Sequence, residues 1–188
     1  MSRYSETCSK RREANTTALA AFELSSTTNK KSSSTFRTVT PGSGPTVFTI
    51  GYERRDGEDL ISCLLDAGVE LLVDVREKPF SRKVDFRKNV LAQHCEQAGI
   101  RYESWTSLGS TAYQRQQLKD TGDFSEFRKR FRDFARRGRT EEIDDLLEVA
   151  SKTVIAMICY ERAHEECHRS ILADLLAERG DAEIVAIH

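Results

Sequence analysis

The sequence predicts a single α/β domain of three layers, α/β/α, built on a mostly parallel, Rossmann-like sheet of about five strands. From Thr46 onward, short apolar runs rich in β-branched residues alternate with stretches that carry apolar residues at helical spacing. These short runs are apolar almost throughout, which is typical of parallel strands that helices cover on both faces. The segment from Thr46 to His188, about 140 residues, suits one domain.

The first half of this segment contains three predicted strands and two predicted helices. Residues 46–50 (TVFTI) form the first strand, and residues 59–67 form a helix that places four apolar side chains on one stripe. Gly51 and Gly68 follow these two elements as turn residues. The next elements are a strand at residues 71–75, a helix at 89–98 and a weaker strand at 100–104.

The second half contains three predicted helices and two predicted strands. One helix carries apolar residues at Phe124, Phe127, Phe131 and Phe134, and another carries them at Ile143, Leu146, Leu147 and Ala150. The run TVIAMIC is apolar enough for a fully buried strand. The last three elements are therefore a strand at residues 153–159, a helix at 165–179 and a strand at 183–187.

Residues 1–45 differ in composition from the rest of the chain. Serine and threonine dominate them, apolar residues are scattered, and a Pro-Gly-Ser-Gly-Pro stretch closes them. We expect this tail to be disordered, because it cannot bury enough apolar surface to offset the entropy cost of ordering. The tail holds 7 of the 29 basic and 3 of the 30 acidic residues, so the domain keeps 22 basic and 27 acidic residues, a net charge of −5. The overall charge of −1 therefore combines a basic tail with an acidic domain.

The composition also excludes two classes of protein. The longest apolar candidate, residues 154–160, is far shorter than the roughly 20 residues that cross a bilayer, so we expect no membrane span. Five cysteines at irregular spacing argue against a secreted disulfide scaffold. A reducing compartment, the cytoplasm, is the expected location.

Polar and reactive residues gather at the carboxyl ends of the predicted strands, the edge where open parallel sheets bind their ligands. The residues expected to bind a ligand are Gly51, Tyr52, Arg76, Ser81, Arg82, Gly109, Arg115, Cys159 and Arg169. Those expected to be catalytic are Asp74, Glu161, Cys167 and His168. Their joint placement predicts a site at this edge.

Six stretches carry a resemblance to a known family. They are TIGY, VDVREKPFSRK, AGIRYE, LGS with the later Arg115, TGDFSEF and CYERAHEECHRS. Together they resemble the domain-of-unknown-function family 488 over residues 47–188, with the C-x-E and C-H-R element as the most specific part. The resemblance implies a small α/β protein and supports the choice of site residues. It implies no particular reaction.

The cysteines and the neighbouring histidine allow three interpretations. Near a helix start and beside His168 and Arg169, Cys167 is placed to be a nucleophilic thiolate. Alternatively, Cys159 and Cys167 are buried packing residues, as most free cysteines are. A metal site would use Cys159, Cys167, His168 and His164. The spacing argues against a structural zinc site, since seven residues separate the two cysteines and the adjacent Cys167 and His168 would point in different directions on one helix. A catalytic site with three ligands remains an alternative.

The arginines at the same edge predict an anionic ligand. Arg76, Arg82, Arg115 and Arg169 come from separate segments, and guanidinium groups bind phosphate or carboxylate in a bidentate manner. The alternative is that each arginine pairs with a local acid, namely Asp74, Glu77 or Glu161. Asp74 and Glu161 are the candidates for proton transfer or hydroxyl binding.

A second basic group lies in the predicted phenylalanine helix, at Arg128, Lys129, Arg130, Arg132, Arg136, Arg137 and Arg139. A solvent-exposed helix face explains this group. Together with Arg82, Lys83, Arg87 and Lys88, however, it also suggests a basic stripe that binds nucleic acid.

The leading hypothesis is an enzyme that acts on a phosphate-bearing substrate, a nucleotide or nucleic acid, by hydrolysis or group transfer. The alternatives are a non-catalytic nucleic-acid or nucleotide binding module and thiol chemistry at Cys167. The sequence fixes no cofactor and no oligomeric state.

Overall fold

A parallel five-stranded sheet organises the protein. The computed structural model describes residues 44–188, so the predicted tail, residues 1–45, lies outside this part of the chain except for its last two residues. The strands are β1 (Thr46–Gly51), β2 (Leu71–Asp74), β3 (Arg101–Ser104), β4 (Ile155–Cys159) and β5 (Glu183–Ile187). Their order is β3-β2-β4-β1-β5, and each neighbouring pair is parallel. The predicted α/β class and parallel sheet are confirmed.

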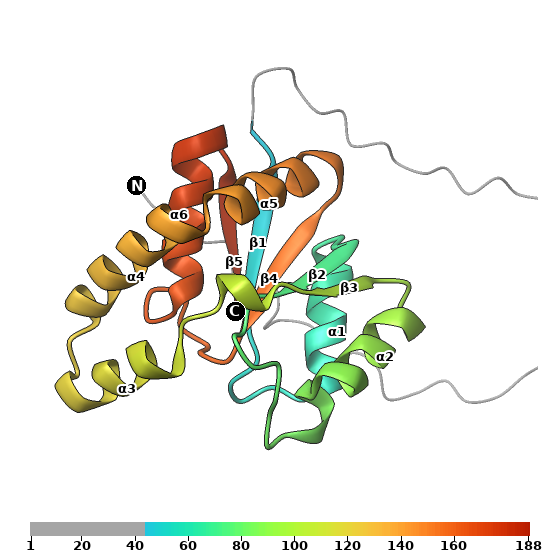
Figure 1. Ribbon diagram of the computed structural model, residues 1–188. Helices are drawn as coiled ribbons and strands as arrows, with labels where there is room; N and C mark the ends of the chain where they lie inside the picture. Colours follow the sequence, from blue (N-terminus) through green and yellow to red (C-terminus); the bar gives the residue numbers. More distant parts are fainter. Residues whose placement is uncertain (1–43) are drawn as a thin grey trace, which may run out of the picture.

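Helices cover both faces of this sheet (Figure 1). They are α1 (Gly57–Asp66), α2 (Lys88–Gln97), α3 (Ala112–Thr121), α4 (Phe124–Gly138), α5 (Thr140–Lys152) and α6 (His168–Gly180). Helices α1 and α2 lie on one face, and α4, α5 and α6 lie on the other. Among the described residues, no helix combines the length and the apolar character that crossing a membrane requires.

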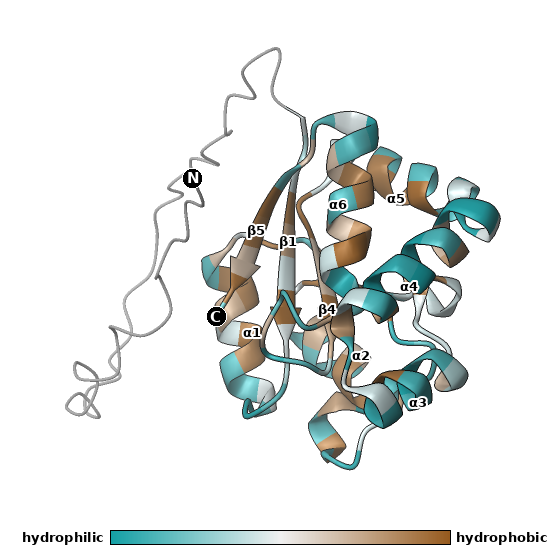
Figure 2. Cartoon of the chain, turned by 90° about the vertical axis from the view of Figure 1, so that its left-hand side faces the viewer, coloured by the Kyte–Doolittle hydropathy of each residue, from teal (hydrophilic) through white to brown (hydrophobic). Residues whose placement is uncertain are grey.

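Each face of the sheet has its own hydrophobic core. Along β4, Ile155 and Met157 face the core shared with α4, α5 and α6, whereas Ala156 and Ile158 face the core shared with α1 and α2. This alternation follows from the two-residue period of a strand. Because both faces are covered, the strand has to be apolar at every position, and Figure 2 shows β4 largely in brown.

Two helices differ from the sequence prediction. Helix α3 has no buried residue and so no apolar stripe to reveal it. A capping box between Thr111 and Gln114 starts it and Gly122, with left-handed backbone, ends it. Helix α6 begins at His168, three residues later than predicted, because residues 161–166 instead form a turn that crosses the end of β1.

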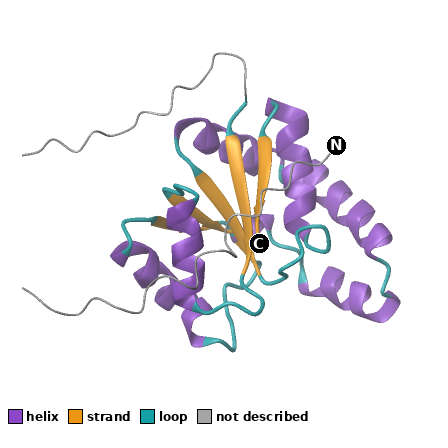
Figure 3. Cartoon of the chain, turned by 180° about the vertical axis from the view of Figure 1, so that it is seen from behind, coloured by secondary structure: helices purple, strands orange, loops and turns teal. Residues whose placement is uncertain are grey.

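The carboxyl ends of β1, β2 and β4 lie side by side at one edge. Gly51 pairs with Cys159, and Asp74 pairs with Ile158 on the other side of β4. Figure 3 shows the loops that leave the strands gathered beyond this edge. The topology therefore brings the predicted site segments together, with β4 between the other two strands.

Candidate functional site

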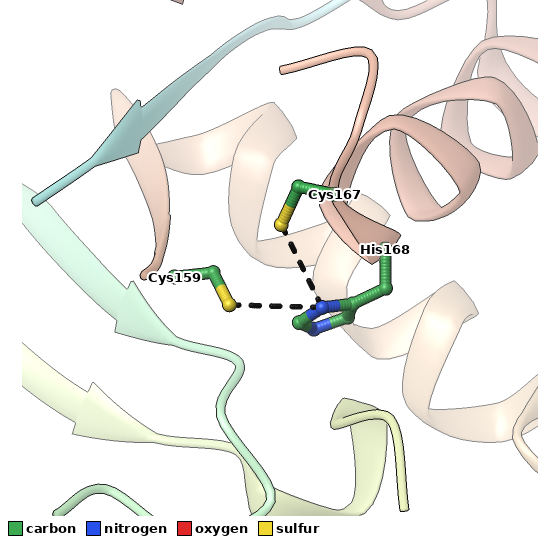
Figure 4. A group of neighbouring side chains, drawn as sticks. All are labelled: Cys159, Cys167 and His168. Atoms are coloured by element: carbon green, nitrogen blue, oxygen red, sulfur yellow. Dashed lines mark hydrogen bonds between the residues drawn. The ribbon is translucent and has the colours of Figure 1, made fainter. Parts of the chain in front are cut away.

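A buried cluster of two cysteines and one histidine occupies the end of β4. Cys159 is the last residue of β4, Cys167 is the N-cap of α6, and His168 is the first residue of that helix. Both sulfurs lie 3.7 Å from Nδ1 of His168, and Figure 4 shows them pointing toward that nitrogen. The expectation that Cys167 and His168 point in different directions is wrong. Cys167 has extended backbone outside the helix, so its side chain turns back toward the ring.

Two charged side chains complete this cluster. Oε2 of Glu161 lies 3.2 Å from the sulfur of Cys159 and 3.0 Å from that of Cys167. Nε of Arg169 donates to the sulfur of Cys167 at 3.2 Å, and its Nη2 donates to the carbonyl oxygen of Glu161 at 2.5 Å. We call these five residues, Cys159, Glu161, Cys167, His168 and Arg169, the thiol cluster.

The backbone immediately after β2 orients the imidazole of His168. Its Nε2 lies 3.0 Å from the carbonyl oxygen of Val75. A carbonyl oxygen only accepts hydrogen bonds, so Nε2 carries a hydrogen and Nδ1 is the atom that faces the sulfurs. The ring of Phe131 contacts the imidazole edge-on, with the centroids 5.4 Å apart. The ring orientation is thus fixed from two sides.

The cluster shifts the pKa values of its own members. Burial alone would raise the pKa of Cys167, but the hydrogen bond with Cys159 and the charges of His168 and Arg169 lower it well below its ordinary value. The pKa of Cys159 is raised by its hydrogen bond with Cys167 and by burial, and burial followed by the charge of Cys167 raises the pKa of Glu161. Burial opposes a charge on His168, yet Cys167 raises its pKa. Negative charge therefore concentrates on Cys167.

This arrangement permits two kinds of chemistry. A thiolate at a helix start, flanked by imidazole and guanidinium groups, is the setting of a nucleophilic cysteine. The ligand atoms of Cys159, Cys167 and His168 also lie within 4.8 Å of one another, a set that could hold one metal ion. These three side chains are only 6%, 1% and 4% exposed. Two hollows in the described surface, about 200 Å³ between α3 and α4 and about 520 Å³ beside α2 and β3, are lined by none of them.

His164, the other predicted ligand, lies outside this group. Its Nδ1 is 2.9 Å from Oγ1 of Thr49 in β1. Burial and the charge of Arg169 lower its pKa. Its bond to Thr49 attaches the turn between β4 and α6 to the sheet.

A second buried cluster surrounds Asp74 at the end of β2. Arg76 donates to both carboxylate oxygens, at 2.8 Å and 2.5 Å, and the hydroxyl of Tyr102 donates to one of them at 2.6 Å. Arg76 also donates to the hydroxyl of Tyr52 and to the carbonyl oxygen of Phe86. Burial would lower the pKa of Arg76, but the bonds and charge of Asp74 raise it. The charges of this pair are balanced within the protein.

Both predicted glycines sit where backbones approach closely. A Cβ added at Gly51 would lie 1.9 Å from the carbonyl oxygen of Glu161, and one added at Gly109 would lie 2.1 Å from the amide nitrogen of Glu77. Because Gly51 has no side chain, the turn at residues 161–166 can cross the end of β1. Gly109 brings a second loop onto the end of β2, where Arg115 pairs with Glu77 at 2.8 Å and donates to the carbonyl oxygen of Ser110.

Arg82 lies on an exposed loop that carries much positive charge. We call residues 78–88 (KPFSRKVDFRK) the basic loop, which holds five cations and one acid. All five cations are exposed, namely Lys78, Arg82, Lys83, Arg87 and Lys88. Within the part of the chain that the structure describes, none of them forms an ion pair with a carboxylate. The single acid, Asp85, accepts a hydrogen bond from the amide of Gly57 at 3.3 Å.

The basic residues of α4 are placed differently. Within residues 44–188, five of the seven named above pair with carboxylates: Arg128 with Asp174, Arg130 with Glu126, Arg132 with Asp174 and Glu178, Arg136 with Glu178, and Arg139 with Glu142. These pairs mostly join α4 to α6. The charge of this helix is thus largely balanced inside the protein. Among the described residues, the predicted stripe therefore divides into a helix paired with carboxylates and a loop without carboxylate partners.

Several contributors to the site had little or no signal in the sequence. The carbonyl oxygens of Val75 and Phe86 orient His168 and Arg76, and any residue supplies a carbonyl. Tyr102 is not among the residues predicted for the site, yet its hydroxyl completes the shell around Asp74. Arg55 is buried and donates to the carbonyl oxygen of Gly51 at 3.1 Å, a role that no motif marks.

Comparison with known proteins gives one match. A family model described as "Domain of unknown function DUF488" matches residues 56–176, which include the thiol cluster, the buried Asp74–Arg76 pair with Tyr102, and the basic loop. Neither the curated proteins nor the solved structures contain a match to this chain.

Proposed function

The chain belongs to the DUF488 family, whose description assigns no activity, so we propose a function from the geometry: binding of single-stranded nucleic acid through the basic loop. The observation that carries this proposal is the set of five exposed cations that have no acidic partner within residues 44–188, on a domain that is acidic overall. Unpaired cations along a loop are what a phosphate backbone requires.

The exposed apolar residues of the loop support a single strand as the ligand. Phe80 is 69% exposed and Val84 is 54% exposed. The guanidinium of Arg87 lies 5.9 Å from the centroid of the Phe80 ring. Aromatic rings beside cations are typical of single-strand binding, because any unpaired base can stack on the ring while the cations follow the phosphates.

The loop is also held in place from within the domain. The amide of Lys88 donates to the carbonyl oxygen of Pro79, Lys83 donates through Nζ to that of Arg55, and Arg76 donates to that of Phe86. Ser81 accepts from the amide of Lys83 at 3.1 Å. A loop fixed in this way loses less entropy when a ligand binds.

An enzymatic role at the same edge has less support. Asp74, the proposed acid or base, is fully buried and has hydrogen bonds to Arg76 and Tyr102. Arg115 and Arg169, proposed to hold the substrate, already have partners in the domain. We therefore favour a binding module over hydrolysis or group transfer on a phosphate-bearing substrate.

Removing two loop cations tests the proposal. We expect the double substitution Arg82→Gln and Lys88→Gln to weaken binding of the full-length chain to a fluorescent oligothymidylate. If five phosphates are contacted, the slope of log K against log salt is about −3.5, and losing two contacts reduces its magnitude by about 1.4. Fluorescence anisotropy at several salt concentrations measures both quantities.

A pair of exposed cations on α4 provides the control. Lys129→Gln with Arg137→Gln changes the net charge equally, and neither residue forms an ion pair among residues 44–188. We expect this control to bind like the wild type. Equal weakening by both pairs would move the site off the loop, and no binding by the wild type at low salt would end the proposal.

Phe80→Ala tests the stacking contact separately. We expect a loss of about 1 to 3 kcal/mol in binding of a single strand, roughly 5- to 150-fold in Kd, and little change for a blunt duplex. Tyr113→Ala, which removes a ring that is 70% exposed on α3, is the matched control and should change neither. Equal losses on single strand and duplex would contradict stacking.

A further inference from the structure

Independently of the proposed function, we propose that Cys159, Cys167 and His168, joined by Glu161, form a metal centre that binds one Zn²⁺ ion. Three of the four ligand atoms lie within 4.8 Å of one another. Two thiolates and an imidazole are preferred zinc ligands, and a carboxylate completes a four-coordinate set.

The separations between these atoms fit a zinc site. Bonds of about 2.3 Å to sulfur and 2.0 to 2.1 Å to nitrogen place tetrahedral ligands roughly 3.5 to 3.8 Å apart. Nδ1 of His168 lies 3.7 Å from each of the two sulfurs. Oε2 of Glu161, at 3.2 Å and 3.0 Å from the sulfurs, is our candidate for the fourth ligand and would have to move slightly outward.

The surroundings of His168 are those of a metal ligand. A metal-binding histidine almost always donates its other N–H to a carboxylate, a backbone carbonyl or water, which leaves the ligating nitrogen bare. The carbonyl oxygen of Val75, 3.0 Å from Nε2, takes that place. Because Val75 follows β2 while His168 begins α6, the fold sets this bond independently of the cysteines.

The charges also balance with a divalent ion. Two thiolates and one carboxylate contribute −3, and Zn²⁺ with the guanidinium of Arg169 contributes +3. Arg169 is 1% exposed and donates to the sulfur of Cys167 at 3.2 Å. N–H donors to a coordinating sulfur belong to the outer shell of such sites. A buried group of anionic ligands is thereby neutralised.

The burial indicates a closed, structural role for the ion. The three ligands are at most 6% exposed, and a structural zinc site uses four protein ligands and leaves no open position. The centre would attach the end of β4 to the start of α6, two elements separated by the turn that crosses Gly51.

Metal analysis of the full-length chain tests this inference. We expect the protein, purified under reducing conditions without chelator, to contain about one equivalent of Zn²⁺ per chain. Cys159→Ser and Cys167→Ser should lose it. Cys95→Ser is the matched control, because Cys95 is an equally buried free cysteine on α2 and should leave the zinc content unchanged.

Two measurements on the wild type keep the test valid if a variant fails to fold. After the metal is removed, added Co²⁺ should give the sulfur-to-cobalt absorption band and the strong visible bands of a tetrahedral site. Zn²⁺ should protect Cys159 and Cys167, but not Cys95, against alkylation followed by mass spectrometry. The inference is overturned if the wild type takes up neither ion, or if Cys167 reacts at the same rate with and without Zn²⁺. That second result would favour a nucleophilic thiol.

Discussion

Asp74→Ala is expected to lower the free energy of unfolding by about 3 to 5 kcal/mol, because it leaves the guanidinium of Arg76 buried without its counter-charge. Asp74 is fully buried and Arg76 is only 6% exposed. The substitution also removes the acceptor of the Tyr102 hydroxyl and the bond to the amide of Arg76. Urea unfolding of wild type and variant measures the difference.

A nearby ion pair on the surface is the control for this experiment. Glu77 pairs with Arg115 at 2.8 Å, but the two side chains are 28% and 38% exposed. Solvent screens such a pair, so Glu77→Ala should cost about 0 to 1 kcal/mol. Equal effects of the two substitutions, or a loss below about 1 kcal/mol for Asp74→Ala, would contradict a structural role for the buried pair.

Phe131→Ala is expected to cost about 3 to 5 kcal/mol, because it opens a cavity in the core between α4 and the sheet. The Phe131 ring is 1% exposed and packs against Phe127 and Phe134, with centroid separations of 6.0 Å to each. It also contacts the imidazole of His168 edge-on. Urea unfolding again measures the loss.

Phe80→Ala makes the same chemical change on the surface and is the control here. Because Phe80 is 69% exposed in the basic loop, its removal should change the free energy of unfolding by no more than about 0.5 kcal/mol. If Phe131→Ala were as mild as Phe80→Ala, α4 would not be packed on the sheet as the structure has it.

Together these substitutions separate stability from binding at one edge of the sheet. Asp74 and Phe131 lie inside the domain, and their loss should destabilise it. Arg82, Lys88 and Phe80 lie on its surface, and their loss should weaken nucleic-acid binding without unfolding it. A variant that loses binding while it keeps wild-type stability would therefore point to contact with the ligand.

The predicted fold depended on patterns that are local in the sequence. The apolar run at residues 153–159 gave β4 within two residues, because a strand covered on both faces has to be apolar at every position. The phenylalanines at helical spacing gave α4, since three or four residues separate positions on one helix face. Helix α3 was not predicted, because it has no buried residue, although the capping pair of Thr111 and Gln114 was a usable signal.

The predicted site depended on the rule that open parallel sheets bind ligands at the carboxyl ends of their strands, and the details of the site did not follow from this rule. The rule placed Cys159, Cys167 and His168 at one edge, and the structure brings them together. It left open whether Arg76 would hold a ligand or pair with Asp74, because a guanidinium that holds a ligand and one that holds a carboxylate look the same in a sequence. Which cations are free depends on distances between segments far apart in the chain.

The sequence by itself determined the α/β class, the strands and most of the helices, and the edge where the reactive residues meet, because hydrophobic periodicity and strand polarity are properties of neighbouring residues. Only the tertiary structure decided how the charges at that edge are used. It paired Arg76 and Arg115 with acids and left the basic loop without carboxylate partners in the described part of the chain. It also turned Cys167 toward His168, because an N-cap residue leaves the helical backbone at the point where the turn from β4 arrives.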